Sequence, residues 1–180
     1  MISRNTFRCF TGLLLLSLSH GKSLQLVEDQ LASDCFNPSG ENCNWYKECL
    51  EKRYQCEKTS YPYAISFAEH FCSRFGTMYN SFSAKGKQWI DATRKCLQVA
   101  LVPLLDPSKV PTCKEIRRFA FKSHTPCYVT PSPQGPSMCD LPFTDWLHVF
   151  HTIKSAFFKA AIPSIRGAFG TLGRCVSQGK

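Results

Sequence analysis

Ten cysteines spread over residues 35 to 175 constrain the fold of this chain more than any other feature of its sequence. They are Cys35, Cys43, Cys49, Cys56, Cys72, Cys96, Cys113, Cys127, Cys139 and Cys175. An even number of cysteines is typical of a disulfide framework built in an oxidising compartment. Zinc binding is the competing interpretation, but it favours short paired spacings, and five residues lie within the shortest gap here, from Cys43 to Cys49. We therefore expect five disulfides.

The first 21 residues have the order of a secretory signal peptide. Two arginines precede an apolar stretch from Cys9 to Leu18, and small residues follow around an expected cleavage point. That stretch is shorter than the roughly 20 apolar residues that span a bilayer, so we predict a secreted, extracellular protein without a transmembrane segment. Cys9, the eleventh cysteine, is expected to leave with the signal peptide.

The remaining length suits a single domain. We expect an N-terminal extension over 22–34, a disulfide-rich domain over 35–175 and a short tail over 176–180. Loss of two arginines with the signal peptide lowers the net charge from +9 to +7. A basic surface favours anionic partners such as sulfated glycans or acidic protein faces. Nucleic acid is not an expected partner outside the cell.

Apolar residues recur at helical spacing along the domain, and strand-like alternation is absent. Helices are predicted over 44–55, 62–75, 83–102, 112–123, 144–161 and 164–172. Thr112 followed by Glu115 predicts a capping box at the start of the fourth helix. The proline-rich segment 126–136 predicts a surface loop. The predicted fold class is an all-α, disulfide-stapled bundle of about five to six helices in one domain.

The last two predicted helices are rich in aromatic residues. The spacing in 144–161 predicts a buried face made of Trp146, Leu147, Phe150, Ile153 and Phe157. In 164–172 a common apolar face is formed by Ile165, Phe169 and Leu172. The basic residues that accompany these aromatics are Lys154, Lys159, Arg166 and Arg174. Such a pattern is found in helices that lie on a membrane surface and also in core helices, and we favour a core role.

Motifs that indicate catalysis are absent from the sequence. It contains no G-x-S-x-G elbow, phosphate-binding loop or H-E-x-x-H pair, so we predict no catalytic residue and no enzyme activity. Asp145, His148 and His151 are the best metal candidates, because spacings of three place neighbours on one helical face. They nevertheless spread over about 200 degrees of a helix and lack an obvious fourth ligand. No metal and no cofactor is predicted.

A cluster of basic residues in the fourth predicted helix is the candidate surface for an anion or a partner. It consists of Lys114, Arg117, Arg118 and Lys122. Spacings of three and four bring such residues together on a helix, where they can bind a sulfated glycan or an acidic protein. An ordinary solvated helix face is the more usual meaning of such a cluster.

The order of the cysteines and one internal segment resemble the stanniocalcin family of secreted helical proteins. The segment from Phe82 to Cys96 reads F-S-A-K-G-K-Q-W-I-D-A-T-R-K-C, similar to that family's F-x-x-x-G-K-x-[FW]-[IV]-x-x-x-x-K-C pattern. The pair Cys127-Tyr128 also matches a C-Y pair of the family, and the gaps between neighbouring cysteines agree closely. The resemblance extends over roughly 35–175.

This resemblance implies both a disulfide pairing and a function. The implied pairs are Cys35 with Cys49, Cys43 with Cys72, Cys56 with Cys113, Cys96 with Cys127, and Cys139 with Cys175. The implied function is that of a regulatory protein, either a hormone-like ligand or a binder and inhibitor of an extracellular receptor or target. Unlike the family, the sequence has no N-glycosylation triplet, since Asn37 is followed by proline. All ten cysteines can pair within the chain, so a covalent dimer is not expected.

A function of another class remains open. The basic and aromatic segment after Cys139 also suits a secreted defence protein that binds lipid or disrupts membranes. Neither interpretation identifies the partner.

Overall fold

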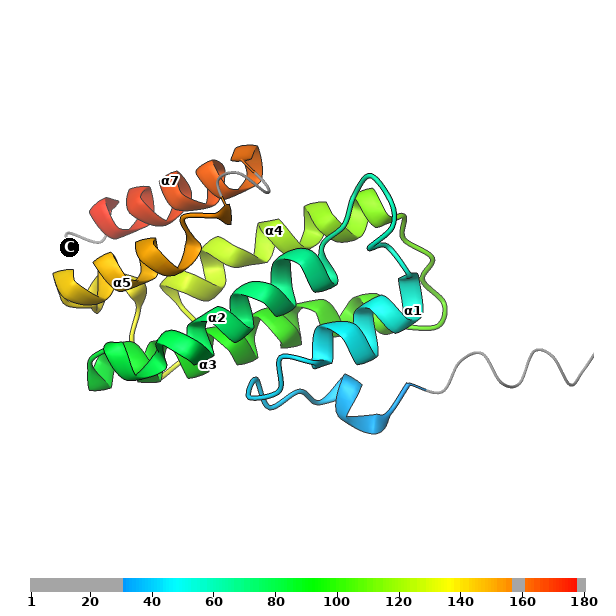
Figure 1. Cartoon of the computed structure of the whole chain (residues 1–180), viewed down its shortest axis with the longest axis horizontal. Coiled ribbons are helices and arrows are strands. Elements are labelled where there is room, and N and C mark those ends of the chain that lie inside the picture. The colour runs from blue at the N-terminus through cyan, green and yellow to red at the C-terminus, as the bar shows by residue number, and fades with distance from the viewer. Residues whose placement is uncertain (1–30, 157–160, 178–180) are drawn as a thin grey trace, which may run out of the picture. The chain divides into compact units, whose positions relative to one another are not determined.

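Helices are the only regular elements in residues 31–156 and 161–177, which the computed structural model describes (Figure 1). The longer ones are α2 (His70–Met78), α3 (Ala84–Leu101), α4 (Cys113–Val129), α5 (Phe143–Ile153) and α7 (Ala161–Ser177). The short ones are η1 (Ser33–Phe36), η2 (Tyr46–Glu51), α1 (Lys52–Tyr54), η3 (Ala64–Glu69), η4 (Tyr79–Ser81), η5 (Val102–Leu105) and η6 (Met138–Asp140). The predicted all-α class is thereby confirmed, and these elements belong to one compact unit that starts at Leu31. The predicted signal peptide, with Cys9, lies outside the described residues.

Five disulfides staple the helices to one another. They are Cys35–Cys49, Cys43–Cys72, Cys56–Cys113, Cys96–Cys127 and Cys139–Cys175. Each is a pair that the family resemblance implies. The third ties the end of the α1 segment to the start of α4, the fourth ties α3 to the last turn of α4, and the fifth ties η6 to α7. Every cysteine from 35 to 175 is therefore used within the chain.

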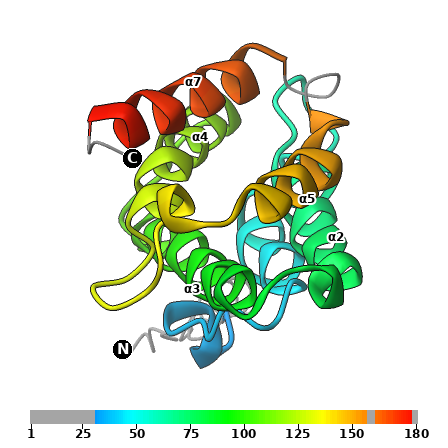
Figure 2. The same ribbon diagram turned by 90° about the vertical axis from the view of Figure 1, so that its left-hand side faces the viewer.

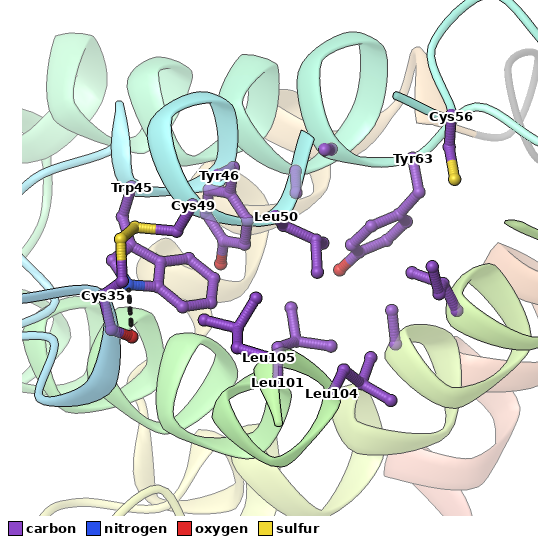
Figure 3. Packing of buried hydrophobic residues seen from close by; sticks show 14 of the residues in the cluster. Cys35, Trp45, Tyr46, Cys49, Leu50, Cys56, Tyr63, Leu101, Leu104 and Leu105 are labelled. Atoms are coloured by element: carbon purple, nitrogen blue, oxygen red, sulfur yellow. Dashed lines mark hydrogen bonds between the residues drawn. A yellow bond between two sulfur atoms is a disulfide. The ribbon is translucent and has the colours of Figure 1, made fainter. Parts of the chain in front are cut away.

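One hydrophobic core lies between η2, η3 and the end of α3 with η5 (Figure 3). The indole of Trp45 packs beside the Cys35–Cys49 disulfide and donates a hydrogen bond to the carbonyl oxygen of Cys35 at 3.1 Å. Both η2 and η3 are wide π-helical turns, a geometry found often at functional sites. In η3 the N–H of Ala68 bonds to the carbonyl of Tyr63, five residues back, at 2.9 Å.

The start of α3 anchors α5. Ser83 is the N-cap residue, and its hydroxyl oxygen accepts a hydrogen bond from the N–H of Gly86 at 3.1 Å. Asp145 of α5 accepts two hydrogen bonds from Ser83, one from its N–H at 3.0 Å and one from its hydroxyl. A Cβ atom at Gly86 would lie 2.4 Å from the Oδ2 of Asp145, so only glycine permits this approach. These contacts fix the rotation of α5 against α3.

Helix α4 begins at the predicted capping box but does not end where the sequence predicted. It continues through Pro126 to residue 129, although we expected an end near 123. Proline lacks the N–H that a helix interior requires. Here α3 holds the last turn, because the Trp89 indole donates to the carbonyl of Tyr128 at 2.9 Å and a disulfide binds Cys127 to α3. The loop predicted from 126 therefore starts only after residue 129.

The buried face of α5 also differs from the predicted one. Leu147 and Phe150 are exposed, whereas the fully buried side chains of α5 are Asp145, Val149 and Thr152. Of the other residues predicted to be buried, Trp146 and Ile153 are half-buried and Phe157 lies outside the described residues. The apolar residues of α5 do occupy one side of the helix, but the helix is rotated so that the polar residues Asp145 and Thr152 face inward with Val149. The bonds of Asp145 to Ser83 fix this rotation. Moreover, α5 ends at Ile153, short of the predicted residue 161.

Helix α7 packs through its small residues and not through its large apolar ones. A Cβ atom at Gly170 would lie 3.0 Å from the hydroxyl oxygen of Thr125 in α4, so the two helices approach closely there. Thr171 and the disulfide-bonded Cys175 are buried on the same side. The face predicted to enter the core is exposed, and its residues are Ile165, Phe169 and Leu172. The apolar stripe of the sequence was therefore correctly identified but placed on the wrong side.

Candidate functional site

An apolar cavity of about 390 Å³ lies among α2, α3, α4, α5 and α7. Figure 2 shows these helices around a common interior, with α5 beside α2 and α7 beside α4, in agreement with the contacts between these pairs. Its lining residues come from segments that run from Tyr46 to Leu172 along the chain. Its size falls in the range of roughly 300–1,000 Å³ that small-molecule sites occupy. The cavity is thus the candidate ligand site of this chain.

Aromatic side chains form the wall on the α2 side. Phe67, Phe71 and Phe75 recur every four residues and all line the cavity. The rings of Phe67 and Phe71 meet edge to face, with centroids 4.8 Å apart. Burying such rings in contact with one another is favourable, and their faces offer an apolar surface to a ligand.

The wall from α4 contributes an uncharged histidine and a tyrosine. His124 and Tyr128 stack with their planes 4° apart, and the hydroxyl of Tyr63 lies 3.3 Å from the Nε2 of His124. Burial lowers the pKa of His124 to about 4 and raises the pKa of Tyr128 to about 12. Both side chains are therefore neutral at pH 7.

Helices α5 and α7 close the remaining side of the cavity. Trp146, Val149 and Ile153 line it from α5. Phe150 and Leu172 also line it but are 59% and 47% exposed, which places the rim at these two helices. Ligand entry is therefore expected between α5 and α7.

Open space borders the lining residue Gly167 of α7. A Cβ atom built there meets no heavy atom within 4 Å, although Gly167 belongs to the cavity wall. The same is true of Gly173, which lies on the same helix but outside the lining. A larger side chain at Gly167 should therefore reduce the cavity, whereas the same substitution at Gly173 should leave it unchanged.

The predicted basic cluster on α4 divides into two parts. Lys114 lies over the ring of Tyr61, with its Nζ 5.9 Å from the centroid, and Arg117 lies over Phe121 at 5.8 Å. Arg118 and Lys122 instead border a second, open depression that is also lined by Lys109, Glu115 and Phe119, among others. Two of the four residues thus lie over aromatic rings of the chain itself, and the other two border this depression.

The three metal candidates of α5 do not converge. Asp145 is buried and bonded to Ser83, His151 is exposed, and the ring of His148 lies 5.4 Å from that of Phe82. Within the described residues no group of three or more histidine, cysteine, aspartate or glutamate side chains is arranged to hold a metal ion. In the same residues no helix is long and apolar enough to cross a membrane.

The cavity is not predicted by the sequence. The sequence shows the regularly spaced phenylalanines of η3 and α2. It does not show whether side chains from other helices fill the space beside them. On α7 the cavity is lined by the small residues Ser164, Gly167, Ala168 and Thr171, with Leu172 at the rim. Comparisons of the chain with protein-family models, curated proteins and solved structures give no match.

Proposed function

We propose that this chain is a secreted regulatory protein with a stanniocalcin-like disulfide core, which acts by binding and not by catalysis. The observation that carries the proposal is the set of five disulfides, each of which is a pair that the family resemblance implies. Pairings of ten cysteines are very numerous, so agreement in all five has weight. The partner is an extracellular receptor or target, and no cysteine from 35 to 175 remains for a covalent dimer.

This proposal is tested by expressing the full chain in a secretory eukaryotic host. We expect it in the medium as a covalent monomer without N-linked glycan, with the five disulfides above found by peptide mapping. The folded product, once labelled, should bind cells of the source organism saturably, and reduction should abolish that binding. Retention inside the host cells, or binding that reduction does not affect, would contradict the proposal.

The cavity favours the lipid-binding part of the alternative function. An apolar interior of about 390 Å³ with a partly exposed rim has the properties of a site for a hydrophobic small molecule. Two of the elements that line it, α5 and α7, follow Cys139, the segment to which the sequence assigned lipid binding. This function is compatible with the first, because a regulatory protein can also hold a small ligand.

Carrying a lipid and disrupting a membrane give different results with the full chain. A carrier binds N-phenyl-1-naphthylamine, a neutral apolar dye, at one site per chain and releases no content from anionic vesicles. A membrane-active protein causes vesicle leakage at concentrations where the dye shows no saturable site. We expect the first result, and leakage without dye saturation would exclude the carrier function.

A further inference from the structure

The cavity wall carries one fixed positive charge. Arg94 of α3 is the only lysine or arginine among the described lining residues, and no aspartate or glutamate is among them. His124 adds no charge at neutral pH, because burial lowers its pKa to about 4. The site is therefore apolar with a single cationic point.

Helix α2 holds this cation in place. The guanidinium of Arg94 donates a hydrogen bond from Nη2 to the carbonyl oxygen of Cys72 at 2.7 Å. A Cβ atom at Gly76 would lie 3.1 Å from the same nitrogen, so α2 passes directly beside the group. Cys72 is itself fixed by its disulfide to Cys43. The position of the charge is thus set by the scaffold before any ligand arrives.

Arg94 has hydrogen-bonding capacity that the chain does not use. Its Nε is buried and has no hydrogen-bond partner among the described residues. The nearest acidic influence is Asp91, one turn earlier in α3, but the Oδ2 of Asp91 accepts a hydrogen bond from the Tyr79 hydroxyl at 2.7 Å. A guanidinium has five N–H donors, and a buried donor without an acceptor is unfavourable. No acidic side chain lines the cavity, so an anion bound there would supply the charge partner that the described lining residues do not give this guanidinium.

We propose that the cavity binds a single-chain amphipathic carboxylate of the fatty-acid class, with its hydrocarbon chain among the aromatic side chains and its carboxylate hydrogen-bonded to Arg94. This inference rests on the apolar-ligand function proposed above and specifies the head group. A carboxylate is the natural partner, since its two oxygens match the planar fork of a guanidinium. The three phenylalanines of η3 and α2 and the rings of α5 supply the apolar surface for the hydrocarbon chain.

The test compares two ligands that differ only in the head group. Myristic acid and myristyl alcohol are titrated at neutral pH, below their aggregation limits, by displacement of N-phenyl-1-naphthylamine. Wild type is expected to bind the acid at least about tenfold more tightly than the alcohol, as a charge-assisted hydrogen bond implies. In Arg94→Gln this ratio should fall close to one while the affinity for the alcohol is unchanged. Arg94→Lys should retain part of the preference.

Lys95→Gln is the matched control, because it removes the same charge from the next residue of α3, which is exposed and outside the cavity lining. It should behave as wild type. If wild type binds acid and alcohol equally, or Arg94→Gln keeps the preference, the inference is wrong while the cavity function stands. If neither ligand displaces the dye and the dye itself does not saturate, both the head-group inference and the proposed apolar-ligand function are wrong. The comparison in wild type decides the matter even if Arg94→Gln fails to fold.

Discussion

The carboxylate of Asp145 in α5 accepts a hydrogen bond from the backbone N–H of Ser83 at the start of α3, 3.0 Å away and 62 residues apart in the chain. Asp145 is buried, and it also accepts a hydrogen bond from the Ser83 hydroxyl. A negative charge at the N-terminus of a helix is stabilised by the helix dipole and by the unpaired N–H groups there. This pair therefore docks α5 and helps to define one wall of the cavity.

Replacing Asp145 by asparagine should destabilise the fold. The amide presents an N–H2 group where the carboxylate accepted a second hydrogen bond, and the charge at the helix start is lost. We expect the free energy of unfolding to fall by roughly 1–3 kcal/mol. Urea denaturation measures it, and Asp34→Asn, at an exposed position of η1, is the control. Equal midpoints for Asp145→Asn and wild type would contradict this role.

Burial of His124 should make stability depend on pH. Its pKa in the folded state is about 4, below the ordinary value of 6.5. Between these values the unfolded chain binds a proton that the folded chain does not, so stability is full above pH 6.5 and declines as the pH falls toward 4. The shift corresponds to about 3 kcal/mol. Urea unfolding at several pH values measures the decline.

His124→Phe keeps an aromatic ring and removes the titration. As the pH falls from 6.5 to 4, the unfolding free energy of wild type should decrease relative to that of this variant. Parallel curves over this range would mean that His124 is accessible to protons in the folded state.

The Cys139–Cys175 disulfide should control the closing side of the cavity. It joins η6, just before α5, to the end of α7 across a sequence separation of 36. The double variant Cys139→Ser/Cys175→Ser is expected to lose roughly 2–4 kcal/mol of stability. Hydrogen exchange should accelerate in α5 and α7 more than in α3. In the control Cys35→Ser/Cys49→Ser, which opens η1 and η2, α5 and α7 should keep their protection, and uniform acceleration in both variants would argue against a separate closing unit.

The two halves of the basic cluster should differ in anion binding. Lys114 and Arg117 lie over aromatic rings of the chain itself, whereas Arg118 and Lys122 border an open depression with Lys109. We therefore expect Arg118→Gln/Lys122→Gln to lower the salt concentration for elution from heparin more than Lys114→Gln/Arg117→Gln. Both variants lose two charges, so equal shifts would indicate net charge alone.

Local signals in the sequence predicted the helices well where the structure is locally determined. The capping box of Thr112 and Glu115 starts α4 as expected, and α3 begins within one residue of the predicted start at 83. The errors arose where distant contacts decide. Pro126 stays inside α4 because α3 holds the following turn, and α5 turns a different face inward because Asp145 bonds to Ser83. Neither contact can be predicted from the spacing of residues within one helix.

The cavity also depends on contacts between segments that are distant in the sequence. The phenylalanines of η3 and α2 are evident in the sequence, but the space beside them depends on how α3, α4, α5 and α7 pack around it. Arg94 stood inside the segment that carries the family resemblance, and nothing in its spacing marked it as the charge of an apolar cavity. Only the placement of α2, α5 and α7 reveals its surroundings.

Filling the cavity tests most directly whether it is a ligand site. Gly167→Leu should place a side chain in the open space of the wall, while Gly173→Leu makes the same change on the same helix outside it. Both should stabilise α7 by about 0.5–1 kcal/mol, since glycine is a poor helix former. Titration with N-phenyl-1-naphthylamine should then show one saturable site in wild type and Gly173→Leu, and strongly weakened binding in Gly167→Leu. Equal binding by all three proteins would contradict a ligand site in this cavity.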